Sequence, residues 1–319
     1  MQTRAITLRN VLPESLYHFS LYATAFSHLR LESIIGKRWQ SSAKKLIRMY
    51  CIWTIIYFPG FVSAYDTLKE AAVAFILGHG YAHLWYLAAA AVAIFMFYII
   101  KTRCVSWKKI FALAGALYLF GLSYDSYYAV FRRLPIWNVP LIHTVARCLL
   151  SQLHTTRDGV FFGFLFVAIG AYIAENKQRI NKRLCAKGFM ISAGAAIVEV
   201  VAVRALRWQR RTDAVDLYVF LIPMATFLFC YLLCSNSNSK KTSSNIRKES
   251  TIIYLVHIWV RTIYLRIGVP VLSNLFGEIL AENSFLIFCI DVLGSIMVAK
   301  VLIIASKTQH GRKIYKWLF

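Results

Sequence analysis

Long apolar runs alternate with short polar segments along the whole chain. Each run has roughly 17–22 residues, which suits a helix that crosses a hydrocarbon core of about 30 Å. Lipid cannot satisfy open backbone donors and acceptors, so helices are the expected form. We therefore predict an all-α, polytopic transmembrane helix bundle of about eight full spans plus a weak N-terminal segment. The predicted spans are 49–65, 84–100, 110–130, 159–175, 187–205, 215–234, 251–267 and 284–305.

The positive charges orient this predicted bundle. One set of loops and the C-terminal tail carry nearly all the lysines, whereas the opposite loops contain one lysine, Lys69. Because cytoplasmic loops are enriched in lysine and arginine, we predict that the basic loops and the C-terminus are cytoplasmic. Residues 1–36 form a degraded or amphipathic N-terminal segment in this interpretation, and residues 37–319 form the transmembrane domain.

The composition agrees with a membrane protein and argues against nucleic-acid binding. Hydrophobic residues make up 59% of the 319, the mean hydropathy is +0.56, and the formal net charge is +23. The charges are distributed as topology signals and as contacts to anionic membrane lipids, so no nucleic-acid partner is needed to explain them. The seven cysteines show no CxxC pair and no metal-ligand spacing, so we expect no metal.

A histidine and a tryptophan mark the outer end of the second predicted span. His83 can exchange a proton near neutral pH, and His79 lies one turn earlier. Trp85 has two interpretations, because tryptophan lines binding sites and also forms ordinary interfacial belts.

Arg157 and Asp158 precede the fourth predicted span. A helix N-terminus favours a bound anion or an acidic side chain, so the pair could bind substrate. Asp158 could equally be a simple N-cap.

Further arginines lie on the side opposite the lysine-rich loops, where the topology rule does not explain them. The guanidinium group binds phosphate and carboxylate through a bidentate fork, which indicates an anionic substrate. Contact with lipid headgroups is the alternative. These arginines are Arg132, Arg133, Arg147, Arg157, Arg204, Arg207, Arg210 and Arg211.

Several ionisable residues fall inside predicted spans, where such groups usually face the interior of the bundle. His257 and Arg261 are four residues apart and share one helix face. Arg261 could pair with Glu199 or Asp291 as a structural ion pair. Asp125 lies near the outer end of the third predicted span.

Five stretches together resemble the acyltransferase-3 family of integral membrane acyltransferases, over roughly residues 37–305. They are 44–57 (basic, then aromatic), 83–87 (HLWYL), 121–128 (GLSYDSYY), 156–170 (TRDGVFFG and onward) and 253–257 (IYLVH). The resemblance implies transfer of an acyl group, often acetyl, from acetyl-CoA or another acyl-CoA to a hydroxyl of an envelope glycan or lipid-linked acceptor. It also implies a bacterial inner-membrane location.

The resemblance also implies roles for individual residues. Lys45 and Arg48 would lie near the acyl-CoA, and Trp85, Asp125, Arg157 and His257 would line the central cavity. We predict catalytic roles for His83, Arg157 and His257. We predict substrate contacts for Lys45, Arg48, Trp85, Asp125, Asp158 and Arg261.

The chain departs from the family pattern at its beginning. The usual first span, with its basic residue and histidine, is missing, and 12–19 replaces the second span only loosely. We therefore expect a truncated product, a mis-assigned start or a diverged member without transferase activity as alternatives to an active enzyme. A small-solute transporter that uses Glu199, Asp291, His257 and Arg261 as a polar path is another alternative, as is a non-catalytic membrane partner.

Overall fold

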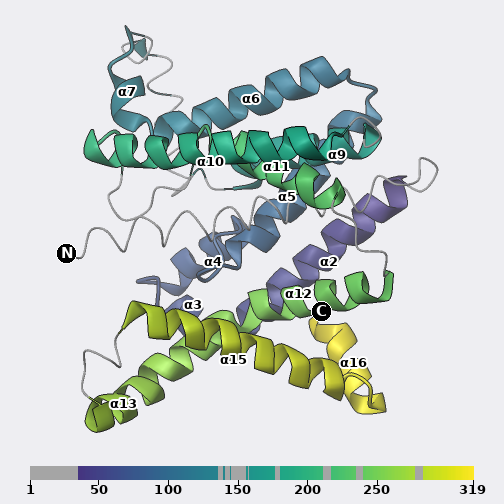
Figure 1. The fold of residues 1–319 in the computed structure, drawn as a ribbon, viewed down its shortest axis with the longest axis vertical. Coiled ribbons are helices and arrows are strands. Elements are labelled where there is room, and N and C mark those ends of the chain that lie inside the picture. The colour runs from purple at the N-terminus through teal and green to yellow at the C-terminus, as the bar shows by residue number, and fades with distance from the viewer. Residues whose placement is uncertain are drawn as a thin grey trace. The chain divides into compact units, whose positions relative to one another are not determined.

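The computed structural model describes residues 35–135, 139–140, 144, 156, 158–176, 180–210, 217–234, 240–276 and 283–319. Every regular element in these ranges is helical, which confirms the predicted all-α class (Figure 1). Of the predicted N-terminal segment 1–36, residues 1–34 lie outside the described residues. The chain forms two compact units. The first unit consists of residues 1–47, 74–79 and 85–236, and the second consists of residues 48–73, 80–84 and 237–319.

The first unit contains the helices α5 (Trp85–Thr102), α6 (Trp107–Tyr124), α7 (Tyr128–Arg132), α9 (Phe164–Glu175), α10 (Lys182–Ala205) and α11 (Leu221–Cys234). A π-helical turn, η3 (Gly159–Gly163), leads into α9. The helix α5 packs against η3 and α9, and α10 packs along α11.

The second unit contains α3 (Phe58–Val62), α12 (Lys240–Ile263), η5 (Tyr264–Gly268), α13 (Val269–Phe276), α15 (Ser284–Ala305) and α16 (Gln309–Leu318). Two helices contribute to both units, namely α2 (Ile35–Ile56) and α4 (Leu68–Ile76). The helix α12 packs along α15, where an added Cβ at Gly294 would lie 2.6 Å from Val260 Cγ1.

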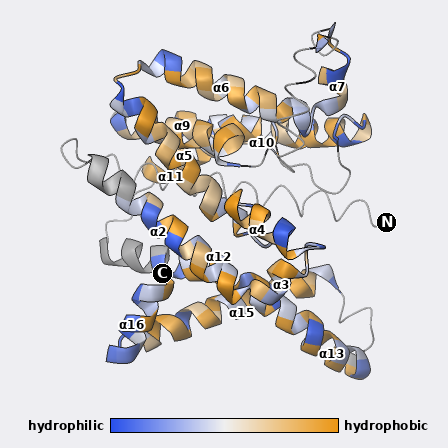
Figure 2. Ribbon diagram, turned by 180° about the vertical axis from the view of Figure 1, so that it is seen from behind, coloured by the Kyte–Doolittle hydropathy of each residue, from blue (hydrophilic) through white to orange (hydrophobic). Residues whose placement is uncertain are grey.

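The predicted number of eight full spans is wrong for the described helices. Four helical segments are long and apolar enough to cross a membrane: Trp85–Thr102, Lys182–Ala205, Lys248–Leu275 and Ser284–Ala305. Two shorter apolar helices cover Gly159–Glu175 and Leu221–Cys234. Figure 2 shows apolar residues along most of α15 and hydrophilic residues along much of α16.

Local breaks account for two of the shortened spans. The first predicted span is divided because α2 ends at Ile56 and Pro59 occupies the first turn of a new helix, α3. The third is divided at Asp125, whose φ of −112° and ψ of −97° leave the helical region. Apolar composition continued through both breaks, so hydropathy alone could not locate them.

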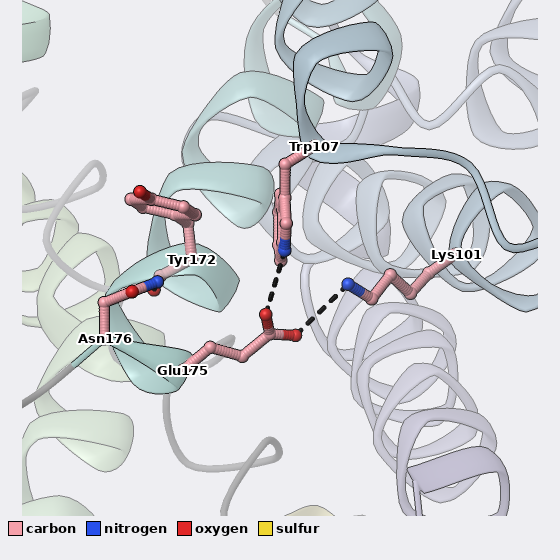
Figure 3. Close-up of polar contacts among 5 residues, drawn as sticks. All are labelled: Lys101, Trp107, Tyr172, Glu175 and Asn176. Atoms are coloured by element: carbon pink, nitrogen blue, oxygen red, sulfur yellow. Dashed lines mark hydrogen bonds and ion pairs between the residues drawn. The ribbon is translucent and has the colours of Figure 1, made fainter.

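A charged cluster joins the C-terminal ends of α5 and α9 to the start of α6 (Figure 3). Lys101 Nζ lies 3.2 Å from Glu175 Oε1 and 4.0 Å from the centre of the Trp107 ring. The indole Nε1–H of Trp107 donates to Glu175 Oε2 at 2.9 Å. The predicted basic loops after the second and fourth spans therefore begin at the same end of this unit.

The glycines of η3 allow close approach to α5. A Cβ at Gly159 would lie 2.4 Å from the carbonyl oxygen of Ala89 and 2.6 Å from Val92 Cβ. A Cβ at Gly163 would lie 3.0 Å from Ala93 Cβ. Small residues four apart on facing helices let backbones approach closely within apolar surroundings.

We predict that Gly159→Ala destabilises the protein by about 1–3 kcal/mol, because the added methyl group has no space. Gly115→Ala is the matched control, since no atom lies within 4 Å of its added Cβ. The control should leave stability unchanged or raise it by about 0.5–1 kcal/mol. Thermal unfolding in detergent compares the two variants, and equal melting temperatures would contradict the packing described for η3.

Candidate active site

Two histidine rings from distant parts of the sequence lie in contact in the second unit. The ring centres of His83 and His257 are 4.6 Å apart, with an angle of 56° between the ring planes. His83 lies just before α5, and His257 lies within α12. We call these two residues the histidine pair.

Tyr254 contacts both members of the histidine pair. Its hydroxyl donates a hydrogen bond to the backbone carbonyl of His83, and its ring meets the His83 ring edge-on at 4.9 Å. The Tyr254 carbonyl oxygen lies 2.8 Å from His257 Nδ1. A carbonyl oxygen only accepts, so Nδ1 of His257 carries a proton. In the neutral ring Nε2 is then a proton acceptor, which is the form a general base needs.

The His83 ring is buried and makes no hydrogen bond with the part of the chain that the structure describes. Its exposed fraction is 3%, and neither ring nitrogen has a hydrogen-bond partner among the described residues. Burial, with a smaller contribution from the charge of His257, lowers the pKa of His83 to about 3. A buried polar atom without a partner costs about 1–3 kcal/mol. Such a cost in a native protein calls for an explanation, and a bound ligand that supplies the missing partner is one.

Aromatic side chains surround the histidine pair. Tyr57 meets the His83 ring edge-on at 5.6 Å and stacks with Trp259 at 5.5 Å. The Tyr57 ring also lies 5.5 Å from Tyr81, and its hydroxyl donates to the carbonyl of Leu255 at 2.8 Å. Apolar walls with a few fixed polar groups are typical of small-molecule binding sites.

The backbone just before His83 is strained. Ala82 adopts a φ of +48°, in the left-handed region that favours glycine. This conformation costs a residue with a Cβ roughly 1–2 kcal/mol. Strain of this kind persists only where the surroundings enforce it, and it is concentrated at functional sites.

Asp158 and Asp125, both predicted to contact substrate, bind backbone in the first unit. Asp158 Oδ1 accepts hydrogen bonds from the N–H groups of Val160 and Phe161 at 2.8 Å, so it is the N-cap of η3. Burial raises the pKa of Asp158 to about 6, although the two hydrogen bonds act in the opposite direction. Asp125 Oδ2 accepts from the N–H of Leu217 at 2.9 Å. These contacts leave the predicted substrate role untested.

Glu199 has the same kind of partners. It is 6% exposed, and its two oxygens accept from the N–H groups of Val219 and Phe220 at 2.6 and 2.8 Å. The hydroxyl of Tyr127 donates to the same carboxylate. Glu199 therefore holds the segment that leads into α11, a role that its sequence position did not reveal.

The other predicted site residues lie on several different helices, or outside the described part of the chain. Lys45 and Arg48 are exposed on α2, and their predicted contact with acyl-CoA stays a prediction. Trp85 is buried, with its ring 6.1 Å from that of Phe162. Arg261 follows His257 by one turn of α12, and Arg157 lies outside the described residues.

Tyr254 was not among the predicted site residues. Its spacing of three from His257 on one helix was a usable signal, because residues at that spacing are neighbours. Its hydroxyl contact with His83 joins positions 171 residues apart, and no local pattern could reveal that contact.

We predict that acid destabilises the folded protein through His83. The pKa of His83 is lowered on folding, so the folded state binds fewer protons and stability rises with pH between about 3 and 6.5. The contribution is fully present above the unfolded pKa and is lost as the pH falls. His83→Phe should melt at an equal or higher temperature at pH 7.5 and show a smaller loss between pH 7.5 and 5. The exposed His310, replaced by Asn, is the control, and an unchanged pH slope in His83→Phe would overturn this prediction.

Comparison with known proteins gives the chain a family. The acyltransferase domain family matches residues 22–304. An amino-acid racemase of Enterococcus faecalis is 24% identical over 266 residues, which cover 81% of this chain and 35% of that protein. A serine/alanine racemase of Enterococcus gallinarum is 27% identical over 241 residues, which cover 72% of this chain and 32% of that protein.

The chain thus spans about a third of the length of these curated relatives. No solved structure matches. The family is associated with membranes, in agreement with the long apolar helices of the structure. The family match covers most of the sequence and includes both members of the histidine pair, and the chain belongs to the acyltransferase-3 family.

Proposed function

We propose that the chain is a membrane O-acyltransferase that moves an acyl group, in the simplest case acetyl, from acyl-CoA to a hydroxyl of an envelope glycan. The observation that carries this proposal is the histidine pair, with buried His83 nitrogens that have no partner in the described structure and a His257 ring whose Nε2 can accept a proton. The family match supports acyl transfer as the type of reaction.

The proposed reaction needs one base and no oxidant or reductant. His257 Nε2 removes the proton of the acceptor hydroxyl while the oxygen attacks the thioester carbonyl carbon. The tetrahedral intermediate then collapses as the carbon–sulfur bond breaks. The imidazolium returns its proton to the leaving thiolate, so an ester and free CoA thiol are the products. The His83 ring is neutral near pH 7 because its pKa is lowered, and it supplies a hydrogen bond to the reacting oxygen atoms.

The proposed orientation places the acyl-CoA on the cytoplasmic side. The cluster of Lys101 and Glu175 marks one end of the first unit, and the contact of Asp125 with Leu217 lies where α6 ends. This arrangement supports the predicted alternation of basic and lysine-poor loops. We propose a bacterial inner-membrane protein with further spans beyond the four recognised here, a cytoplasmic C-terminus, and acyl-CoA contacts from Lys45 and Arg48.

Loss of the base should abolish transfer. We predict that His257→Ala lowers kcat by about 10²–10⁴-fold, the usual range for a general base. Tyr254→Phe removes the hydroxyl that contacts His83 while the carbonyl that orients His257 remains, so it should lower kcat by a smaller factor. His310→Ala, an exposed histidine in α16, should have no effect.

The assay follows label from radiolabelled acetyl-CoA into the polymer fraction of membranes that contain the full chain. Each variant is first checked for its expression level and melting temperature. Equal labelling by the parent and by a folded His257→Ala would contradict the assignment of His257 as the base.

A second candidate function is amino-acid handling without acyl transfer, in uptake or as a membrane partner of another activity. The specific support is the similarity to proteins named amino-acid racemase and serine/alanine racemase over 72–81% of this chain. We predict that proteoliposomes containing the chain do not accumulate labelled L-serine above empty liposomes when acyl-CoA is absent. Accumulation that His257→Ala leaves intact would favour this candidate over the acyltransferase.

A further inference from the structure

Two arginines and two tyrosines form a continuous set of contacts at one end of the first unit. The Arg210 guanidinium lies 3.8 Å from the centre of the Tyr124 ring. The rings of Tyr124 and Tyr128 meet edge-on at 6.3 Å. The Arg132 guanidinium lies 5.7 Å from the Tyr128 ring centre, and its Nη1 donates to the Tyr128 hydroxyl at 3.0 Å. We call these four residues the arginine–tyrosine ladder.

Backbone hydrogen bonds hold the two halves of the ladder together. The N–H of Arg210 donates to the carbonyl of Asp125 at 3.0 Å, and the N–H of Ala129 donates to the carbonyl of Trp208 at 2.8 Å. These bonds join the corner between α6 and α7 to the segment that follows α10. The ladder therefore has a fixed backbone frame, which lowers the entropy lost when a ligand binds.

The guanidinium groups of the ladder form no ion pair with the described residues. Arg132, Arg207 and Arg210 are exposed. The ion pair found in the described parts of the chain joins Lys101 on α5 to Glu175 on α9, away from these arginines in sequence. The Arg210 guanidinium lies over the face of the Tyr124 ring, so its N–H edge stays available for hydrogen bonds. Arg132 uses one of its five N–H donors for the Tyr128 hydroxyl, and its other donors stay available. Such an edge matches the two oxygens of a phosphate or carboxylate.

We infer that the arginine–tyrosine ladder binds the anionic groups, phosphate or carboxylate, of the glycan that receives the acyl group. The inference rests on the proposed acyltransferase function. It also explains why arginines occur on the side that the lysine distribution predicts to be outside, where the topology rule does not require positive charge. Arginine suits this role better than lysine, because the planar guanidinium group presents two parallel N–H donors to the two oxygens of an anionic group.

The experiment measures binding without an acyl donor. The full chain is placed in nanodiscs of phosphatidylcholine and titrated by calorimetry with a glycerol-phosphate oligomer, a galacturonate oligomer and a neutral malto-oligosaccharide. We expect one or both anionic oligomers to bind and the neutral one not to bind. The two anionic titrations show whether phosphate or carboxylate is the preferred group.

Three double variants make the test specific. Arg132→Gln with Arg210→Gln should weaken binding of the anionic oligomer at least about tenfold, as expected for the loss of charge-assisted contacts. Arg132→Lys with Arg210→Lys keeps the charge but loses the stacked fork, and should weaken binding by about three- to tenfold. Lys108→Gln with Lys109→Gln removes two exposed charges from the first turn of α6, and should change affinity by less than about twofold.

Equal affinities of the Gln and control variants would overturn the inference, as would equal binding of the neutral oligomer. The inference also fails if the oligomers do not bind and the Arg-to-Gln pair instead abolishes a rise in melting temperature caused by phosphatidylglycerol. Anionic binding without any acyl transfer would refute the proposed function and leave the ladder as an anion site. Acyl transfer that the ladder variants do not affect, in a chain that binds no anionic oligomer, would refute the ladder alone.

Discussion

Polar groups inside apolar helices must find partners within the protein, because lipid offers none. Three acidic side chains meet this constraint through backbone N–H groups, namely Asp125, Asp158 and Glu199. Two buried tyrosines meet it in the other direction, because the hydroxyls of Tyr57 and Tyr118 donate to backbone carbonyls at 2.8 Å. In each case a polar side chain completes the hydrogen bonding of backbone where a helix begins, ends or meets a neighbour. The contacts of Asp158 and Glu199 hold the start of η3 and the segment that leads into α11.

His83 departs from this rule at both of its ring nitrogens. Its ring is as buried as the core residues around it, yet both nitrogens are without a hydrogen bond in the described structure. The neighbouring Ala82 has a strained backbone, and Tyr254 holds the His83 carbonyl. Backbone strain and unpartnered buried nitrogens both lower the stability of the folded protein. Such costs are concentrated at functional sites, where they are retained for the activity. The ring of His257, oriented by a backbone carbonyl, provides the base for the proposed chemistry.

The sequence predicted the helical class and the family, and it named both histidines of the pair as candidates without indicating that they meet. Apolar length and the loop charges were sufficient for the class, and the predicted span 284–305 coincides with the helix Ser284–Ala305. The number of spans was wrong, because Pro59 and Asp125 interrupt apolar runs that hydropathy treats as continuous. The partners of Glu199 could not be predicted, since they are backbone groups 20 and 21 residues away whose position depends on the fold. The part of the proposed site that depends on Arg157 lies outside the described residues.

Transfer across a sealed membrane tests most directly whether the chain is an acyltransferase. Proteoliposomes are loaded with radiolabelled acetyl-CoA, and a hydroxylated oligosaccharide is supplied outside. We expect label on the external oligosaccharide, and none when His257→Ala replaces the parent chain. Label that appears only when donor and acceptor share one compartment, or that persists in the variant, would contradict this expectation.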